Sequence, residues 1–165
     1  MLIPGWEGRF FEEFNVGDVY RCRYGRTVTE ADNIQFTLLT NNTNQIHFNR
    51  EYGKRTEFGQ CLINSALTLA IVAGMSVSDV SENGFALGWD AIVLPHPLFA
   101  GDTLYSTSEV LETRGSRSRP GLGIVKVRTR GLNQRGAVVI EFARSVMVWK
   151  RSHAPAMNLF PEMQP

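Results

Sequence analysis

Cysteine and net charge are both scarce in this sequence. The chain of 165 residues has only two cysteines, Cys22 and Cys61, which form neither a zinc-binding pattern nor a disulfide framework. Its 17 basic and 16 acidic side chains leave a net charge of +1, so no overall field attracts nucleic acid or an anionic membrane. An aromatic content of 10% and the absence of charge blocks exclude intrinsic disorder. We therefore expect a folded protein with neither nucleic acid nor a membrane as partner.

Long apolar runs and a secretory leader are lacking as well. Met1 is followed by a segment with no basic region and no long apolar stretch, so the expected compartment is the cytoplasm. The longest uncharged stretch, Gln60 to Ser78, is interrupted by amides and hydroxyls and has no basic flank, which argues against a membrane span. Its apolar residues cover most of a helix circumference from Asn64 to about Val77. We expect a buried helix there, about 20 Å long at about 1.5 Å per residue.

Short alternating apolar runs, most of them after this helix, are bounded by turn residues. They predict strands at Val19–Val28, Ala86–Leu94, Asp102–Leu111, Ile124–Arg130 and Ala137–Lys150. The connections are too short for parallel crossovers, so the strands are expected to be antiparallel. Thr29 begins a short helix that runs through Leu39, with Asp32 completing a capping box. The predicted fold class is α+β, with an antiparallel sheet of about five strands wrapped around one long apolar helix.

The length of the chain predicts a single domain, 1–165, with a core from about residue 10 to 151 and a proline-containing tail at 152–165. A single sheet covers only one side of the apolar helix. The other side of the helix and the edges of the sheet then need cover. We therefore expect a homodimer, with assembly into a higher homo-oligomer left open.

The segment between the two predicted helices carries the residues with catalytic potential. Leu39 to Asn49 reads LTNNTNQIHFN. This segment resembles the motif of the MaoC-like dehydratases, the hot-dog-fold family that includes the (R)-specific enoyl-CoA hydratases. The matching positions are Leu39, Thr40, Asn44, Ile46, His47, Thr56, Phe58 and Gly59, and the resemblance extends from about Phe10 to Arg151. It implies a hot-dog fold and an acyl-CoA substrate, with CoA entering as part of the thioester and no separate cofactor. No His, Cys, Asp or Glu cluster has metal-ligand spacing, so no metal is expected.

The chain departs from the family motif at its acidic position. Asn41 replaces the motif glycine, Gln45 replaces its proline, and Asn42 replaces the aspartate that activates water together with the histidine. An amide cannot take a proton as a carboxylate does, and losing a general base costs about 10²–10⁴ in rate. The resemblance therefore implies His47 as the catalytic acid–base group, with Asn42 holding water or substrate by hydrogen bonds. An imidazole can both accept and donate a proton near neutrality.

Three alternatives to this assignment stay open. Another carboxylate, from Asp32, Glu57 or Asp90, can take the place of the missing aspartate. The site can also bind acyl-CoA without hydrating it. In the third alternative, Asn42 belongs to an ordinary asparagine-rich turn and has no catalytic part.

Further residues are candidates for contacts with the acyl thioester. The resemblance places Asn44 and Gly59 in substrate binding. At the start of the apolar helix, Asn64 and Ser65 offer backbone N–H groups and the positive end of the helix dipole to the thioester oxygen. Simple capping of the helix is the alternative role of these two residues.

A run of three arginines lies between Arg114 and Pro120. The resemblance places Arg117 and Arg119 near the phosphates of CoA, which guanidinium groups match well, with a solvated hairpin as the alternative. We assign no role to His96, which stands between two prolines and is expected to be exposed. Cys61 is expected to be a packed small residue.

The leading hypothesis is a hydro-lyase that reversibly adds water to a 2-enoyl-CoA. Small hydratases with a similar asparagine imply a short branched or C5-dicarboxylic acyl group, such as itaconyl- or mesaconyl-CoA, and Arg55 is named as a candidate for the extra carboxylate. The second hypothesis is a non-catalytic acyl-CoA-binding protein. An acyl-CoA thioesterase is less favoured, because the apolar helix carries no carboxylate.

Overall fold

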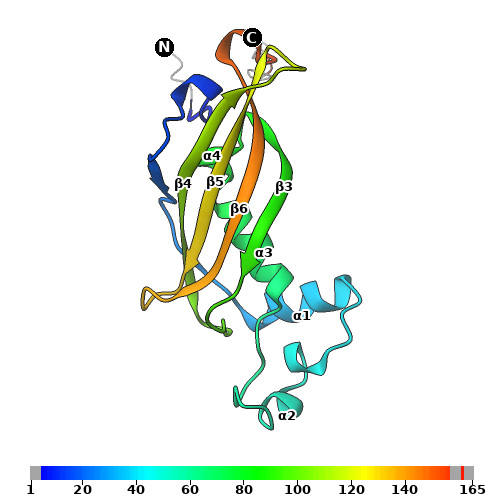
Figure 1. The fold of residues 1–165 in the computed structure, drawn as a ribbon. Coiled ribbons are helices and arrows are strands. Elements are labelled where there is room, and N and C mark those ends of the chain that lie inside the picture. Colours follow the sequence, from blue (N-terminus) through cyan, green and yellow to red (C-terminus); the bar gives the residue numbers. More distant parts are fainter. Residues whose placement is uncertain (1–4, 157–160, 162–165) are drawn as a thin grey trace.

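The computed structural model describes residues 5–156 and 161, and its centre is a six-stranded antiparallel sheet (Figure 1). The strands are β1 (Val19–Arg21), β2 (Arg26–Thr27), β3 (Gly84–Val93), β4 (Thr103–Gly115), β5 (Leu122–Leu132) and β6 (Val138–Trp149). Their order is β1-β4-β5-β6-β3, and β2 pairs separately with β4. Every pairing is antiparallel, which confirms the predicted fold class.

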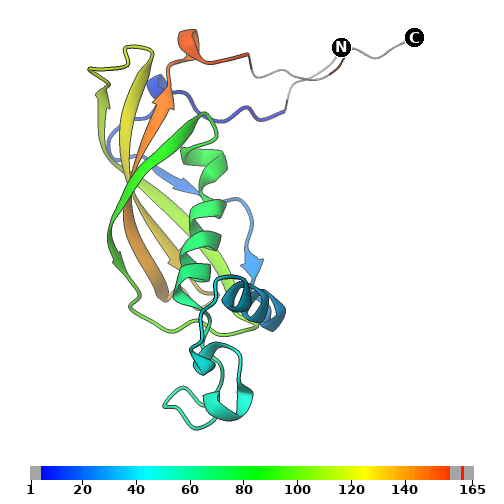
Figure 2. The same cartoon turned by 90° about the vertical axis from the view of Figure 1, so that its right-hand side faces the viewer.

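The helices fall into two groups. They are η1 (Phe11–Glu13), α1 (Glu30–Leu39), η2 (Gln45–His47), α2 (Arg50–Gly53), α3 (Ser65–Met75), α4 (Val77–Val80) and η3 (Arg151–His153), where η marks a 3₁₀ helix. Helix α3 lies along one face of the curved sheet (Figure 2), while α1 and α2 project beyond one end of it (Figure 1). None of the helices in the described ranges is long and apolar enough to cross a bilayer.

The main core lies between α3 and the inner face of the sheet. Val72 on α3 packs there with Ile140 and Phe142 of β6, and all three side chains are fully buried. Gly131 on β5 permits this close approach, because a Cβ at that position would lie 2.6 Å from Val72 Cγ2. The sheet therefore wraps one side of α3, as the hot-dog resemblance predicts.

The first predicted strand is interrupted, which corrects the expected count of about five strands to six. Val19–Val28 was expected to be continuous, but residues 22–25 separate β1 from β2. Gly25 lies in this break against the ring of Tyr105. A Cβ there would be 2.6 Å from Tyr105 Cε1. At Gly25 the chain thus passes close to an aromatic ring, between two short strands that both pair with β4.

Helix α3 is shorter than the predicted helix that ran to Val77. Its 11 residues span about 16 Å at about 1.5 Å per residue. The helix ends at Ser76, whose Oγ donates to the Ala73 carbonyl oxygen (2.7 Å) and accepts from Arg144 Nη2 (2.9 Å). Arg144 is buried against this negative end of the helix dipole, and its desolvation lowers the pKa of the guanidinium.

As expected from the sequence, the sheet of a single chain covers only one side of the apolar helix. One side of α3 is exposed in the single chain, at Ser65, Ala66, Ala70 and Gly74. Within residues 5–156, the neighbouring strand β3 pairs on one side only, with β6. Its exposed apolar residues, together with the residue that follows it, are Phe85, Leu87, Trp89, Ile92, Val93 and Leu94. We call these six residues the β3 edge.

The start of α1 is the capping box that the sequence predicts. Thr29 Oγ1 accepts from the Asp32 backbone N (3.2 Å), and Asp32 Oδ2 accepts from the Thr29 backbone N (2.8 Å). Hydrogen bonds from Thr29, then the bond and charge of Arg26, lower the pKa of the Asp32 carboxyl below its ordinary value of 3.8. A carboxyl whose pKa is depressed by folding stabilises the protein above its unfolded pKa, and this contribution is lost as pH falls through the folded pKa.

Replacing Asp32 with asparagine should therefore destabilise the protein in a pH-dependent way. At neutral pH we expect the free energy of unfolding to fall by about 1 kcal/mol, the usual value of a helix cap. Urea unfolding of wild type and variant at neutral pH and in steps below pH 4 measures the difference, which should shrink as the pH falls. As a control, Asp90→Asn at an exposed position should change stability by less than about 0.5 kcal/mol. A difference that stayed constant with pH would contradict this account of the cap.

Candidate active site

Asn33 on α1 joins the segments that meet at the site. Its side chain is almost fully buried, and its Nδ2 donates to the backbone oxygens of His47 (2.7 Å) and Leu62 (3.1 Å). Its Oδ1 accepts from the Asn64 backbone N (2.8 Å). One buried amide thus connects α1, η2, the segment before α3 and the start of α3. This residue was not among the candidates named from the sequence, because its partners are main-chain atoms 14 to 31 positions away.

His47 is the last residue of η2 and is held by the main chain. The N-cap of η2 is Asn44, whose Oδ1 accepts from the Ile46 backbone N (3.2 Å). The His47 side chain is 8% exposed, and its Nδ1 lies 2.9 Å from the Leu62 carbonyl oxygen. Because a carbonyl oxygen only accepts, we assign a proton to Nδ1. In the neutral ring, Nε2 then carries a lone pair that can accept a proton.

A cavity of about 340 Å³ adjoins His47. Most of its wall is apolar, and the lining residues are His47, Phe58, Leu62, Ile63, Ser65, Thr68, Leu94, Pro95, His96, Pro97, Leu98 and Val139. The polar side chains come from only four of them: His47, Ser65, Thr68 and His96. A mostly apolar wall lowers the local dielectric constant and strengthens each polar interaction made inside.

No carboxylate lines this cavity in the part of the chain that the structure describes. Asp32 is used by the capping box, Asp90 lies 3.6 Å from Lys126 Nζ, and Glu57 is exposed. The described part of the chain also contains no group of three or more His, Cys, Asp or Glu side chains that could bind a metal ion. The ionisable side chains of the wall are therefore His47 and His96.

Asn42 forms a turn next to the site. Its Oδ1 accepts from the Asn44 backbone N (3.0 Å), and its own N donates to the Thr37 carbonyl oxygen (3.0 Å). This is the asparagine turn of the third alternative, and Asn42 is not among the residues that line the His47 cavity. Asn41, at the motif glycine, has a φ of 52°, a left-handed conformation that asparagine tolerates better than most residues. The water-holding role of Asn42 stays a prediction.

The start of α3 combines a cap with one unused donor. Asn64 Oδ1 accepts from the Ala66 backbone N (3.0 Å), so Asn64 is the N-cap, and its own backbone N–H is taken by Asn33. Among the described residues, the Ser65 backbone N–H has no assigned acceptor. Ser65 is exposed in the single chain and lines the His47 cavity. Of the two amides predicted to face a thioester oxygen, the Ser65 amide is the one that stays available.

A family model described as mesaconyl-CoA hydratase matches residues 6–157. The chain belongs to the mesaconyl-CoA hydratase family. A mesaconyl-CoA hydratase from Cereibacter sphaeroides is 32% identical over 148 residues, which are 89% of this chain and 43% of that protein. A β-methylmalyl-CoA dehydratase from Chloroflexus aurantiacus is 34% identical over 151 residues, which are 90% of this chain and 43% of that protein. This family member thus spans less than half the length of the curated relatives it matches.

Solved structures agree with the predicted hot-dog fold. A MaoC domain protein from Chloroflexus aurantiacus is 31% identical with a TM-score of 0.86, covering 99% of this chain and 47% of that one. A MaoC-like dehydratase from Rhodospirillum rubrum is 28% identical with a TM-score of 0.79, covering 87% and 99% of the two chains. A Mycobacterium tuberculosis protein with a double hot-dog fold has a TM-score of 0.80 at 19% identity, a likeness of fold alone. The predicted resemblance to MaoC-like proteins is confirmed.

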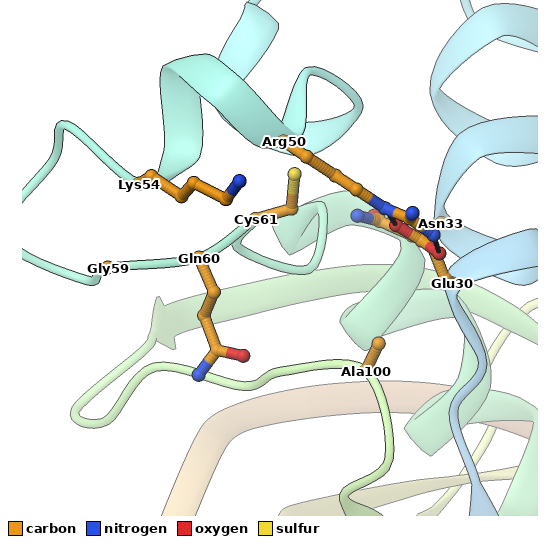
Figure 3. Close-up of a pocket in the computed structure, with 8 residues that line it drawn as sticks. All are labelled: Glu30, Asn33, Arg50, Lys54, Gly59, Gln60, Cys61 and Ala100. Atoms are coloured by element: carbon orange, nitrogen blue, oxygen red, sulfur yellow. Dashed lines mark hydrogen bonds and ion pairs between the residues drawn. The ribbon is translucent and has the colours of Figure 1, made fainter.

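This mesaconyl-CoA hydratase family member has a second cavity, of about 280 Å³, whose lining residues differ from those of the His47 cavity (Figure 3). It is lined by Glu30, Asn33, Arg50, Lys54, Gly59, Gln60, Cys61 and Ala100. Arg50 Nε donates to Glu30 Oε1 (2.7 Å), and a second bond joins Arg50 Nη2 to Glu30 Oε2. Burial and the charge of Glu30 raise the pKa of the Cys61 thiol, so the reactive thiolate is disfavoured. Gly59, a predicted substrate contact, faces this cavity and not that of His47.

Arg117 and Arg119 lie in the hairpin between β4 and β5, far from His47 in the same chain. Leu98 lines the His47 cavity shortly before β4 begins, and the hairpin follows the other end of this 13-residue strand. At about 3.3 Å per residue, β4 spans about 40 Å. The Arg119 guanidinium lies 5.9 Å from the ring centroid of Phe85 on β3. The structure does not bring these arginines to the His47 cavity within one chain, and their contact with CoA stays a prediction.

Proposed function

We propose that this chain reversibly hydrates a methyl-branched C5-dicarboxylic enoyl-CoA, with mesaconyl-CoA as the substrate that its family favours. The observation that carries the proposal is His47: its Nδ1 is fixed by a backbone carbonyl, and its ring lines a mostly apolar cavity beside the start of α3. Membership of the mesaconyl-CoA hydratase family supports the reaction class.

The reaction needs one group that takes a proton and later returns it. In the hydration direction, Nε2 of His47 accepts a proton from water as the hydroxyl oxygen bonds to C3 of the enoyl group. The C2–C3 π electrons move toward the thioester and give an enolate. The imidazolium then returns the proton to C2, so that one water molecule has been added in total. Dehydration runs through the same steps in reverse.

Negative charge builds up on the thioester oxygen in this mechanism. The Ser65 backbone N–H is suited to stabilise it, because it stands at the positive end of the α3 dipole and belongs to a residue that lines the same cavity. The apolar wall makes such a donor more effective than it would be in water. The hydratase role thus assigns His47 as the catalytic residue and Ser65 as the oxyanion donor.

A direct assay separates this function from its alternatives. Purified protein is mixed with mesaconyl-CoA or crotonyl-CoA, and both the absorbance of the conjugated thioester and the release of free thiol are followed. Loss of conjugation without thiol release, most rapid with mesaconyl-CoA, is the expected result. Tight binding without either change would favour a non-catalytic acyl-CoA-binding protein, which the lack of a carboxylate in the described cavity wall also suggests. Thiol release would favour a thioesterase and contradict the hydratase.

Two copies of the chain are proposed to form the working unit. The β3 edge is apolar and paired on one side only, and one face of α3 is uncovered. The curated relatives are about twice as long, so a second copy can supply the length that this chain lacks. If Arg117 and Arg119 bind CoA phosphates, the hairpin must come from the other copy, since β4 separates them from His47 in their own chain.

Changing Trp89 on the β3 edge to glutamate should disrupt the dimer. Trp89 is 44% exposed in the single chain, and a buried carboxylate facing its symmetry mate would be costly. In sedimentation-velocity experiments at micromolar concentration, we expect the wild type to be a dimer and Trp89→Glu to be a monomer. This corresponds to a loss of at least about 2 kcal/mol in the free energy of association. The control Leu39→Glu, at an 82% exposed position on α1, should stay dimeric. A monomeric wild type would refute the proposed assembly.

A further inference from the structure

His96 is the second imidazole of the His47 cavity and comes from a different part of the chain. It lies in the connection between β3 and β4, whereas His47 ends η2. Its Nδ1 lies 2.8 Å from the Val138 carbonyl oxygen at the start of β6. Pro95 and Pro97 flank it and restrict the backbone. No role was assigned to His96 from the sequence, and the structure places it on the cavity wall.

The hydrogen bond of Nδ1 determines which ring nitrogen of His96 can bind a ligand. The Val138 oxygen accepts, so Nδ1 carries a proton and Nε2 is the nitrogen left for a ligand. When the ring is doubly protonated, Nε2 donates a charge-assisted hydrogen bond. A carboxylate placed there favours the protonated ring, because a nearby opposite charge stabilises the charged form.

The chemistry of the proposed substrate requires such a donor close to His47. In mesaconyl-CoA the methyl group is on C2, and the free carboxylate is bonded to C3, the carbon that receives the hydroxyl. A residue that holds this carboxylate must therefore line the same cavity as the group that activates water. Of the described residues that line the cavity, only His47 and His96 can carry a positive charge. Arg55, the candidate from the sequence, lines neither of the two cavities.

We propose that His96 binds the free carboxylate of the dicarboxylic acyl-CoA through Nε2, and so selects this substrate over a monocarboxylic one. This inference rests on the proposed function and adds to it the residue that recognises the substrate. The two imidazoles of the cavity then have different roles, because His47 transfers the proton at C2 and C3 while His96 holds the group attached to C3.

The test compares two pairs of thioesters that differ only by a carboxylate in place of a methyl group. The saturated pair, 2-methylsuccinyl-CoA and 2-methylbutyryl-CoA, cannot be hydrated, so their dissociation constants report binding alone. The unsaturated pair, mesaconyl-CoA and tiglyl-CoA, reports kcat/KM. The variants are His96→Gln and His96→Lys, and His153→Gln, at an exposed residue of η3, is the matched control.

For His96→Gln, whose amide can donate only an uncharged hydrogen bond, we expect the dissociation constant of 2-methylsuccinyl-CoA to rise about 10-fold, because charge-assisted hydrogen bonds are about twice as strong as neutral ones. Binding of 2-methylbutyryl-CoA should change less than about two-fold, which also shows that the variant is folded. His96→Lys restores a cation and should keep most of the preference for the carboxylate. The preference for mesaconyl-CoA over tiglyl-CoA in kcat/KM should fall in parallel for His96→Gln alone.

Two results would overturn the proposal: equal weakening of both saturated thioesters in His96→Gln, or unchanged binding of both. Failure of the wild type to hydrate mesaconyl-CoA is a separate outcome. It would overturn the proposed function, while the saturated pair would still decide whether His96 recognises the carboxylate.

Discussion

Replacing His47 with alanine is expected to lower kcat for the hydration of mesaconyl-CoA by about 10²–10⁴. The imidazole is the one group that we assign to take a proton from water and return it to carbon. Since Asn42 stands where the family motif has an aspartate, no carboxylate at that position can take over the role. Initial rates from the loss of the conjugated thioester absorbance measure the effect. KM should change little, because the imidazole acts mainly in the transition state.

A second variant separates the chemistry of His47 from its structural contact. In His47→Asn the side-chain Nδ2 stands close to the position of the imidazole Nδ1 and can still donate to the Leu62 carbonyl oxygen, but the amide cannot accept a proton at neutral pH. This variant should be folded and as inactive as His47→Ala. The matched control is His153→Ala, whose ring is exposed and bonded to Ser152 Oγ (2.9 Å), and it should keep full activity. Less than about ten-fold loss in both His47 variants would show that the proton is carried by another group.

Asn33 is expected to be the most sensitive position for stability. Asn33→Leu keeps a similar branched shape but leaves the Asn64 N–H and the His47 carbonyl without the partner they have, while the Leu62 carbonyl keeps its bond to His47 Nδ1. A buried polar group left without a partner costs about 1–3 kcal/mol, so a total loss of about 3 kcal/mol or more in the free energy of unfolding is expected. Urea unfolding measures this loss directly.

The same substitution should reduce activity beyond what stability explains. Asn33 fixes the backbone of His47 and the start of α3, so its loss moves the proton acceptor relative to the oxyanion donor. We expect kcat to fall at least about ten-fold at a temperature where the variant is folded, since small misplacements of catalytic groups are costly. Asn15→Leu, at an exposed amide between η1 and β1, is the control and should leave both quantities nearly unchanged. A stable, active Asn33→Leu protein would contradict the role given to Asn33.

Patterns in the sequence predicted those features of the fold that depend on contacts between residues close together in the chain. The Thr29–Asp32 capping box is satisfied within four residues, and the alternation in β5 reports one buried face, so both could be read from the sequence. The break between β1 and β2 could not, because Gly25 in this break lies against the ring of Tyr105, a residue far away in the sequence. The uncovered side of α3 was expected, because one sheet covers only one side of a helix. Apolar residues all round a helix do not indicate, however, which molecule covers the rest.

The candidate site likewise contains residues that the sequence identified and residues that it did not. His47 was named from a motif, and the structure places it in a cavity with Ser65 from the predicted helix start. Asn33 and His96 escaped notice because each is held by a main-chain oxygen of a distant segment, and backbone carbonyls leave no pattern in a sequence. Arg117 was placed near the substrate by resemblance, yet within one chain the length of β4 keeps it away.

The most direct test of the role of His47 is a crystal structure with β-methylmalyl-CoA bound to the His47→Asn variant, which should not turn it over. The account predicts the C3 hydroxyl within hydrogen-bond distance of the position of the His47 ring, and the thioester oxygen next to the Ser65 backbone N–H. An acyl group bound instead in the second cavity, against Arg50 and Cys61, would contradict it and remove His47 from the reaction.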